Sequence, residues 1–291
     1  MRAEGEGPGE RKPRLICHHR QSACSTSCRF LYSRGMKTFT DIHSHVAWDI
    51  DDGIPTKQDA LTVLKMAEQD NIMTIASTPH MIPGTTDLDV IAARQEELKD
   101  LARRQGIMIR TGAELFMNRA SIRAIASGFV RPYEGTRYQL CEYDVRRDLH
   151  DIDFYQDPLY ELEMKDLVPV IAHVERYFRD GLDEDIVQEW RDAGYVIQVN
   201  RTSLLGMHGK TIEKNAWKLV DQGLADVVAT DTHQTEGPRI TQLSDVYDEI
   251  ARRNGEEVAD LLLVENPARI LRDKPVVDVP ATRRKKRFLF F

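Results

Sequence analysis

Cysteine is scarce in this sequence of 291 residues, which contains only Cys17, Cys24, Cys28 and Cys141. Three of the four lie within the first 28 residues, so the rest of the chain holds one cysteine and no disulfide framework. This distribution is typical of proteins that work in a reducing cytoplasm.

Long hydrophobic runs and an excess of positive charge are also missing. No apolar run approaches the roughly 20 residues that a membrane-spanning helix requires. The net charge of −7 argues against a general nucleic-acid binder, although it does not exclude a nuclease pocket. Apolar residues make up 41% of the chain, enough for a proper core, and the length suits one α/β barrel.

Residues 1–35 differ from the rest, because they are rich in Gly, Arg, Cys and Ser and show no hydrophobic period. We expect Met36 to be the natural start and 1–35 to be a disordered or non-native extension. They lack the continuous apolar stretch of a signal peptide. The alternative is a small zinc site, although the spacing of its candidate ligands fits no standard finger. Those candidates are Cys17, His18, His19, Cys24 and Cys28.

Residues 276–291 are predicted to form a tail that follows a domain spanning 36–275. A basic cluster at 283–287 precedes the aromatic-rich end at 288–291. The simplest expectation is a solvated tail, and the alternative is contact with an anionic membrane surface.

Between the tails, short apolar runs alternate with amphipathic stretches. One such stretch, 57–70, places Ala60, Val63, Leu64 and Ala67 on one helical face. Alternation repeated seven times predicts a parallel sheet, and right-handed crossovers favour its closure into a distorted (β/α)7 barrel of one domain. The expected strands are 37–42, 72–77, 107–113, 138–142, 168–172, 195–199 and 225–229. The expected helices are 57–70, 88–105, 118–127, 157–166, 183–193, 211–222 and 241–262.

Histidine and carboxylate residues fall at the ends of the expected strands. His43 and His45 share one face of an extended chain, because side chains alternate with a period of two. The carboxyl ends of barrel strands meet on one face of the fold, where sites are built. The candidate metal ligands are His43, His45, Asp52, His80, Glu114, Glu142, His173, Asp231 and His233.

These nine residues are too many for one ion and suit two or three ions with shared ligands. Imidazole and carboxylate ligands together fit Zn, Mn or Fe. Each residue alone has an ordinary structural explanation, so the prediction depends on their joint occurrence at six of the seven strand ends. His150 and His208 lie outside the pattern, and Cys141 is expected to be a core thiol.

Six ordered motifs resemble those of the polymerase-and-histidinol-phosphatase (PHP) superfamily. Within it, they are most similar to the manganese-dependent tyrosine phosphatases of bacterial capsular and exopolysaccharide operons, the CpsB/YwqE type. The likeness runs from about residue 38 to about 272 and includes Glu265-Asn266-Pro267. The motifs are Asp-Ile-His-Ser-His at 41–45, Asp-Asp-Gly at 51–53, Ser-Thr-Pro-His at 77–80, Gly-Ala-Glu at 112–114, Ile-Ala-His-Val-Glu-Arg at 171–176 and Thr-Asp-Thr-His at 230–233.

The resemblance implies up to three ions, with manganese the expected metal. One ion would be held by His43, His45, Glu114 and Asp231, a second by Glu114, Glu142 and His173, and a third by Asp52, His80 and His233. The family also implies arginines that grip the phosphate. Arg176 matches one of them, although a surface ion pair with Glu175 or Asp180 is the alternative. The second arginine of the family normally follows a glycine shortly after the last metal-binding histidine. Here Pro238 stands between Gly237 and Arg239, so Arg239 is displaced by one position.

The implied reaction is hydrolysis of phosphotyrosine on the tail of a bacterial tyrosine kinase that controls polysaccharide export. The implied location is the cytoplasm, with no stable nucleic-acid binding. The alternatives are a histidinol-phosphate phosphatase, a PHP nuclease and a metal-stabilised domain that regulates a kinase without chemistry. Asp49 and Asp51 are candidate general acids. Trp48, Met81, Ile82 and Pro83 are expected either to flank the substrate's ring or to pack as ordinary loop residues.

Overall fold

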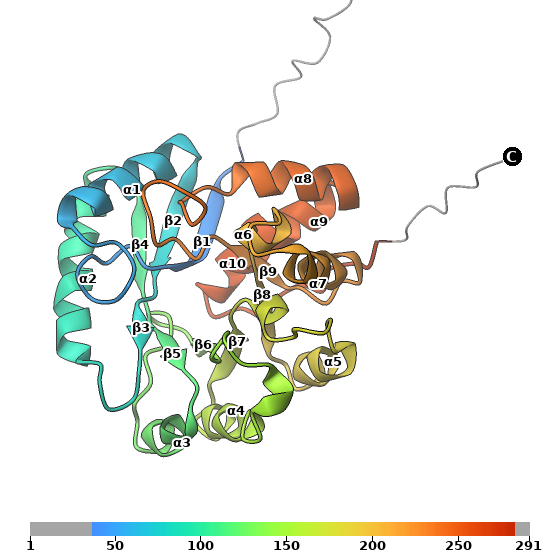
Figure 1. Cartoon of the computed structure of the whole chain (residues 1–291). Coiled ribbons are helices and arrows are strands. Elements are labelled where there is room, and N and C mark those ends of the chain that lie inside the picture. The colour runs from blue at the N-terminus through green and yellow to red at the C-terminus, as the bar shows by residue number, and fades with distance from the viewer. Residues whose placement is uncertain (1–36, 283–291) are drawn as a thin grey trace, which may run out of the picture. The chain divides into compact units, whose positions relative to one another are not determined.

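The computed structural model describes residues 37–282 (Figure 1). The expected start at Met36, the alternative zinc site within the first 35 residues and the basic and aromatic end at 283–291 lie outside the described residues. Within 37–282, strands gather in the middle of the view and helices lie outside them (Figure 1).

Two of the seven expected strands, 72–77 and 107–113, are each followed by a further short strand that the sequence analysis did not predict. Pro79 lacks an N–H for the ladder and separates β2 from β3, while Gly112 and Ala113 separate β4 from β5. The observed strands are β1 (Phe39–Ser44), β2 (Ile72–Ser77), β3 (His80–Met81), β4 (Met108–Thr111), β5 (Glu114–Phe116), β6 (Tyr138–Glu142), β7 (Val168–Ile171), β8 (Val196–Asn200) and β9 (Val227–Ala229).

All strand pairs are parallel, which confirms the expected α/β fold with parallel sheets. One sheet has the order β1-β2-β4, and the other has the order β3-β5-β6-β7-β8-β9. A parallel bridge between Ser44 and Thr232 joins the end of β1 to the segment after β9. The His45 N–H donates to the Thr232 carbonyl at 2.9 Å across this bridge. The first and last strands are therefore neighbours.

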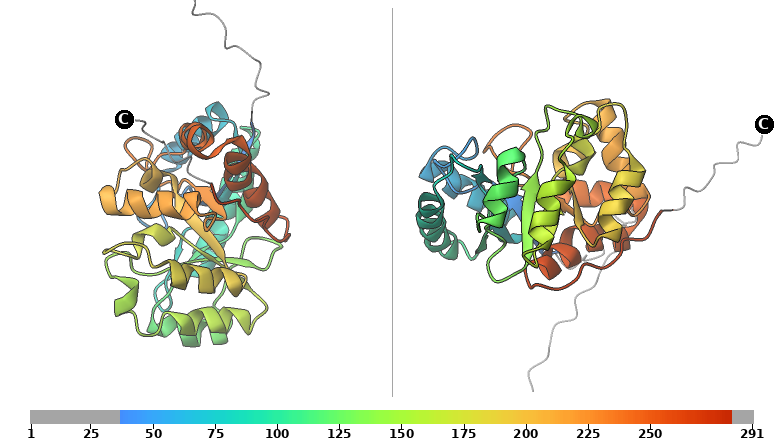
Figure 2. Two further views of the ribbon diagram at one scale, coloured as in Figure 1. Left: turned by 90° about the vertical axis from the view of Figure 1, so that its right-hand side faces the viewer. Right: turned by 90° about the horizontal axis from the view of Figure 1, so that it is seen from below.

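Helices follow most strands and cover them from outside, as the two views of Figure 2 show. Side-chain caps fix several of their starts: Thr56 caps α1, Asp87 caps α2 and Asn118 forms a capping box on α3. The helices are α1 (Lys57–Gln69), α2 (Leu88–Arg103), α3 (Arg119–Ala126), α4 (Gln156–Glu163), α5 (Glu184–Asp192), α6 (Arg201–Leu204), α7 (Lys210–Asp221), α8 (Ser244–Asn254), α9 (Glu256–Asp260) and α10 (Asn266–Ile270).

The expected helix 241–262 is broken. Gly255 has a φ of 103°, which a helix cannot accommodate, so α8 ends there and α9 begins. A π-helical segment, Leu261–Glu265, then leads into α10. By contrast, the expected apolar face of α1 is buried as the pattern predicts, with Ala60, Val63, Leu64 and Ala67 in the core.

The described part of the predicted tail, 276–282, packs on the domain. Asn266 exchanges two hydrogen bonds with the backbone of Val277, and Val279 is buried. The Thr282 N–H donates to the Asp221 carbonyl at the end of α7. Among residues 37–282, no helix is long and apolar enough to cross a membrane.

Candidate metal centre

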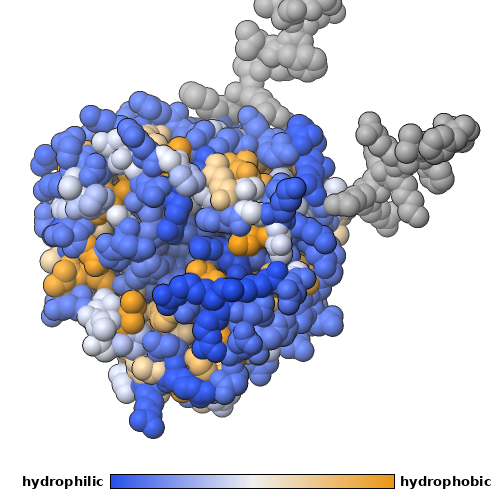
Figure 3. Space-filling model, in the orientation of Figure 1, coloured by the Kyte–Doolittle hydropathy of each residue, from blue (hydrophilic) through white to orange (hydrophobic). Residues whose placement is uncertain are grey.

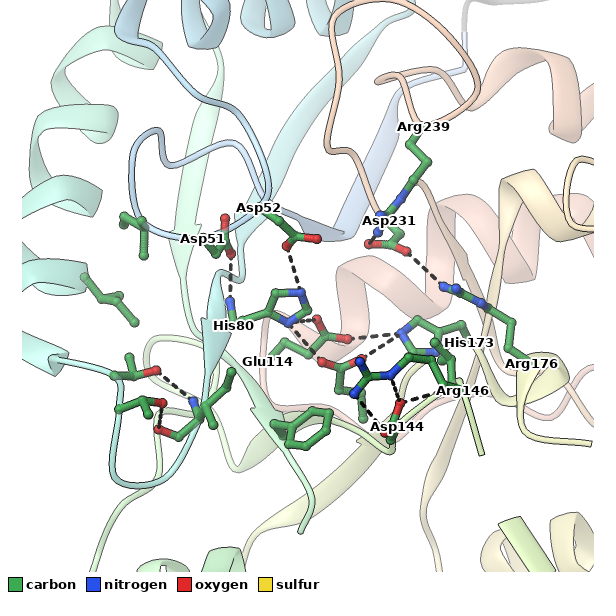
Figure 4. A pocket seen from close by; sticks show the side chains of 18 of the residues that line it. Asp51, Asp52, His80, Glu114, Asp144, Arg146, His173, Arg176, Asp231 and Arg239 are labelled. Atoms are coloured by element: carbon green, nitrogen blue, oxygen red, sulfur yellow. Dashed lines mark hydrogen bonds and ion pairs between the residues drawn. The ribbon is translucent and has the colours of Figure 1, made fainter. Parts of the chain in front are cut away.

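The nine predicted ligands come together at the carboxyl ends of the strands. Figure 4 shows His80, Glu114 and His173 facing Asp52 and Asp231 across a common space. Three overlapping groups of described residues bring ligand atoms within 4.8 Å of one another, as a bound ion requires. These groups are His43, His45 and Asp231; His45, His80 and His233; and His80, Glu114 and Glu142.

The first group is completely buried and converges tightly. The Nε2 atoms of His43 and His45 are 3.2 Å apart. The same two atoms lie 3.4 and 3.6 Å from Asp231 Oδ1. Each also lies 3.2 Å from one oxygen of Glu114. Two imidazoles and two carboxylates therefore point at one small volume.

Glu114 is shared between this group and its neighbours. His173 Nε2 lies 3.3 Å from Glu114 Oε1 and 3.5 Å from Glu142 Oε2. His80 Nδ1 lies 3.0 Å from Glu114 Oε2 and 2.9 Å from Glu142 Oε1. A carboxylate with neighbours on both of its oxygens is suited to bridging two ions.

The third predicted ligand set, formed by Asp52, His80 and His233, lies nearer to solvent. Asp52 Oδ1 lies 3.2 Å from His80 Nε2 and 3.6 Å from His233 Nε2. The Asp52 side chain is 70% exposed, whereas that of His233 is 3% exposed. His80 faces Asp52 with one ring nitrogen and the two glutamates with the other, so it lies between Asp52 and the glutamates.

Unsatisfied polar atoms indicate that this centre suits cations. Both carboxylate oxygens of Glu114 are buried and have no hydrogen-bond partner, although buried polar groups are normally paired. Burial opposes a charge on His43, yet the charges of Glu114 and Asp231 outweigh it and raise the pKa of His43 to about 9. The field in the centre therefore stabilises positive charge.

A buried layer of amides on β8 orients the ligands, and the sequence analysis did not identify it. Gln198 Oε1 lies 3.0 Å from His43 Nδ1, which places the Nδ1 proton there and leaves Nε2 free to bind an ion. Gln198 donates in turn to Asn200, and Asn200 donates to Asp231 Oδ2, both at 2.8 Å. Gln198 and Asn200 are two residues apart on a fully buried strand, and this spacing could have indicated that both amides face the same side.

Asp51 supports His45 and does not have the character expected of a general acid. Asp51 Oδ2 lies 2.8 Å from His45 Nδ1. Burial opposes the charge of Asp51, but His45 outweighs it and lowers the pKa of Asp51 to about 2, so the carboxyl group holds no proton to give at neutral pH. Gly53 completes the motif, because a Cβ there would lie 2.4 Å from the Cβ of His45.

Two of the predicted ligands have strained backbones. His173 has a φ of 36° and Asp231 a φ of 53°, in the left-handed region that non-glycine residues rarely adopt. Each lies just beyond its strand, β7 or β9, where the chain turns sharply. Such strain costs about 1–3 kcal/mol at each position and occurs preferentially at functional sites.

Two arginines lie beside Asp231, on the side of the centre that faces the pocket (Figure 4). Arg176 Nη1 lies 3.9 Å from Asp231 Oδ2, and neither Glu175 nor Asp180 forms the surface pair that was the alternative. Arg239 Nη2 lies 2.8 Å from Asp231 Oδ1. The Arg239 carbonyl accepts hydrogen bonds from the N–H groups of His233 and Gln234, so a tight loop brings Arg239 back to the centre despite its displaced sequence position.

The centre opens into a pocket of about 760 Å³. The face in Figure 3 is largely hydrophilic, with separate apolar patches. Six apolar side chains line the pocket beside the polar centre, an arrangement that suits an aromatic ring attached to an anion. They are Ile50, Ile82, Val90, Ile91, Phe116 and Val145.

Trp48, Met81 and Pro83 do not line this pocket, so for three of the four residues the alternative of ordinary packing applies. Trp48 is 6% exposed and is covered by Lys57 and Arg94, whose cationic groups lie over its ring. Met81 is fully buried in the core. Ile82 does line the pocket. The sequence of a short apolar loop does not indicate which of its side chains are buried in the core.

The residues set aside in the sequence analysis lie apart from the centre. Cys141 is a fully buried thiol that contacts the Val170 carbonyl. His150 is exposed and pairs with Asp148 and Asp183. His208 lies 2.9 Å from the Thr202 hydroxyl.

Residues 39–272 match the family described as "Capsular polysaccharide synthesis, CpsB/CapC". The chain belongs to this family. The match spans every predicted ligand and both arginines. It also spans β1 to α10, so the family's fold accounts for nearly all of the described residues.

Named relatives of the family agree with this assignment. The tyrosine-protein phosphatase CpsB of Streptococcus pneumoniae is 28% identical over 80% of this chain and 98% of that protein. A putative tyrosine-protein phosphatase CapC of Staphylococcus aureus is 30% identical over 66% of this chain and 76% of that protein. A solved structure, described with YwqE of Bacillus subtilis and CpsB as metal-dependent tyrosine phosphatases, has a TM-score of 0.74. It is 23% identical and covers 85% of this chain and 100% of its own, so it supports the fold.

Proposed function

We propose that this protein is a metal-dependent tyrosine phosphatase that hydrolyses phosphotyrosine on a bacterial tyrosine kinase. The observation that carries this proposal is the convergence of five histidines and four carboxylates beside two arginines, in a chain of the CpsB/CapC family. The proposed role lies in capsular or exopolysaccharide synthesis, and the proposed location is the cytoplasm.

The fold supports a site of this kind. We infer that the parallel strands close into a distorted seven-stranded barrel, in which β2 and β3 form one interrupted strand and β4 and β5 another. The Ser44–Thr232 bridge supports this closure. Closure explains why ligands from positions 43 to 233 meet, because all strand ends then face one opening.

The proposed ligand sets are those implied by the resemblance, with manganese as the metal and zinc or iron as chemically acceptable substitutes. His43, His45, Glu114 and Asp231 would hold one ion, and Glu114, Glu142 and His173 a second. Asp52, His80 and His233 would hold a third. Bound ions would supply charge stabilisation to the phosphoryl group and a nucleophile at neutral pH. The buried oxygens of Glu114, which lack hydrogen-bond partners, support its role as the bridging ligand.

Arg176 and Arg239 are proposed to bind the phosphoryl oxygens. Guanidinium groups form charge-assisted, often bidentate bonds to phosphate, and these bonds strengthen as negative charge develops during the reaction. Both side chains line the pocket and are partly exposed, at 19% for Arg176 and 25% for Arg239. A substrate entering the pocket would therefore meet both.

The apolar wall of the pocket is proposed to hold the tyrosine ring. Phe116 ends β5 and Val145 follows β6, the strands that supply Glu114 and Glu142, so a ring against them would place its phosphate at the centre. A phenolate has a conjugate acid with a pKa near 10 and leaves readily. The reaction therefore does not require a general acid, in keeping with the ionised state of Asp51.

The decisive experiment is a parallel assay of the purified full chain with manganese on three substrates: a phosphotyrosine peptide, histidinol phosphate and single-stranded DNA. We expect turnover of the phosphotyrosine peptide to exceed the other two by at least about tenfold. Faster turnover of histidinol phosphate would instead identify a small-molecule phosphatase. Glu114→Ala is the control, because a contaminating phosphatase would persist in that preparation.

A further inference from the structure

A second hollow of about 370 Å³ adjoins the catalytic pocket. Val145 and Arg176 line both spaces, so the two spaces share part of their walls. The second hollow lies between the loop that follows β7 and the start of α7. The two spaces are therefore adjacent.

The second hollow has a strongly one-sided charge. Arg176, Arg179 and Lys210 line it, and none of its described lining residues is a carboxylate. This contrasts with the chain as a whole, which has a net charge of −7. Arg179 and Lys210 are exposed, and the Arg179 guanidinium donates one hydrogen bond to the Arg146 carbonyl.

His208, which also lines the hollow, shows the effect of the positive potential there. Burial lowers the pKa of His208, and the charges of Arg176 and Arg239 lower it further. The charge of Asp231 acts in the opposite direction but is the smaller effect, so the arginine charges prevail at this position.

The start of α7 adds to this potential. Gly209 caps the helix without any side-chain hydrogen bond, and Gly209, Lys210, Thr211 and Ile212 all line the hollow. The first N–H groups of a helix carry partial positive charge when no side chain satisfies them. The contribution of the helix reinforces the three cationic side chains.

We propose that this second hollow is an anion subsite that binds an acidic group of the peptide near the phosphotyrosine, either a carboxylate or a second phosphate. The proposal rests on the proposed phosphatase function and extends it to substrate selection. Arg179 and Lys210 would be specificity-determining residues, because they touch the substrate away from the reacting phosphate. Arg176 would contact both spaces.

The test compares three phosphotyrosine peptides that differ at one neighbouring position, which holds glutamate, glutamine or phosphotyrosine. We expect the manganese-loaded wild-type protein to favour the acidic peptides over the glutamine peptide by about three- to tenfold in kcat/KM, the range for two or three partly exposed ion pairs. The preference should fall as salt is raised. In the double variant Arg179→Ala/Lys210→Ala, the ratio should fall to about one.

Lys214→Ala is the matched control, because Lys214 is an exposed lysine one turn further along α7 and does not line the hollow. It should keep the wild-type ratio. An unchanged ratio in the double variant, or equal turnover of all peptides by the wild type, would overturn the subsite. If only the peptide with a second phosphotyrosine is preferred over the glutamine peptide, the subsite is specific for phosphate. If the glutamate peptide is preferred as well, the subsite accepts either anion.

A binding measurement separates failure of the subsite from failure of the phosphatase proposal. Fluorescently labelled peptides with a non-hydrolysable phosphonate in place of the phosphate should bind with the same three- to tenfold preference. If no peptide is cleaved but this preference is present and depends on Arg179 and Lys210, the proposed reaction fails and the subsite stands. If cleavage occurs without any preference in binding or turnover, the subsite alone fails.

Discussion

The side-chain carbonyl of Gln198 lies 3.0 Å from His43 Nδ1, so the other ring nitrogen, Nε2, faces the metal centre. We expect Gln198→Ala to weaken manganese binding by about 10- to 100-fold, the usual effect of removing such a supporting partner. Isothermal titration with manganese measures this directly.

The control for this prediction is Gln139→Ala. Gln139 is equally buried on β6, but its amide binds the backbone of Ala113, Leu140 and Arg131 and no predicted ligand. The two variants should lose stability to a similar degree, and only Gln198→Ala should lose affinity for manganese. Equal affinities would mean that Gln198 does not orient His43.

The two arginines beside Asp231 are expected to act on the reacting phosphate. Arg176→Ala and Arg239→Ala should each lower kcat/KM by roughly ten- to a thousandfold, the effect of losing one donor to the transition state. Both variants should still bind manganese, because neither side chain is a predicted ligand, with the weaker affinity expected for Arg239→Ala because Arg239 contacts Asp231 and His233. Steady-state kinetics with an aryl phosphate, together with metal analysis, test both expectations.

Arg252→Ala provides a matched control at the surface. Arg252 is 70% exposed on α8 and pairs with Glu249, so its loss should leave kcat/KM within twofold of wild type. A similarly small change for Arg239→Ala would show that the displaced arginine does not bind the phosphate and that Arg176 acts without it.

At the scale of elements, Gly223 fixes how the segment 276–282 lies against the end of α7. Its φ is 70°, and a Cβ there would lie 2.3 Å from the Val279 carbonyl oxygen. We expect Gly223→Ala to lower the free energy of unfolding by about 2–5 kcal/mol, because backbone strain and overpacking add together. Denaturant unfolding measures this change.

Gly255→Ala is the comparison that separates these two causes. Gly255 also has a positive φ, at 103°, but no atom lies within 4 Å of where its Cβ would be. This variant should therefore lose only the strain contribution of about 1–3 kcal/mol. If the two variants were equally destabilised, the contact between Gly223 and Val279 would make no difference to stability.

For the whole molecule, the metal centre should contribute to stability as well as to catalysis. Manganese at about 100 times its dissociation constant should stabilise the fold by about 2.7 kcal/mol. For a chain of this size that corresponds to a rise in Tm of about 5–10 °C. Chelation should abolish both the rise and the phosphatase activity, and added manganese should restore them.

Glu114→Ala and His150→Ala provide the paired test of this prediction. Glu114 neighbours four histidines of the centre, whereas His150 is exposed and pairs with Asp148 and Asp183. The rise in Tm with manganese should disappear in Glu114→Ala and persist in His150→Ala. A rise that survives in Glu114→Ala would place the stabilising ion elsewhere.

The sequence by itself determined the alternation of strands and helices, the family resemblance and the positions of the candidate ligands, eight of them near strand ends and Asp52 in the loop after the first strand. These features depend on local patterns, because a strand has a period of two and polar residues directly after an apolar run mark its end. The spacing of His43 and His45, two residues apart, is therefore sufficient to assign both side chains to one face of the strand.

Only the tertiary structure decided which side chains meet across long separations in the chain. The support of His43 by Gln198, the return of Arg239 to Asp231 and the burial of Trp48 beneath Lys57 and Arg94 depend on distances between different elements. A sequence pattern contains no such distances, because packing of the core and pairing of β1 with the segment after β9 set them. The second, cationic hollow likewise exists only where three separate segments come together.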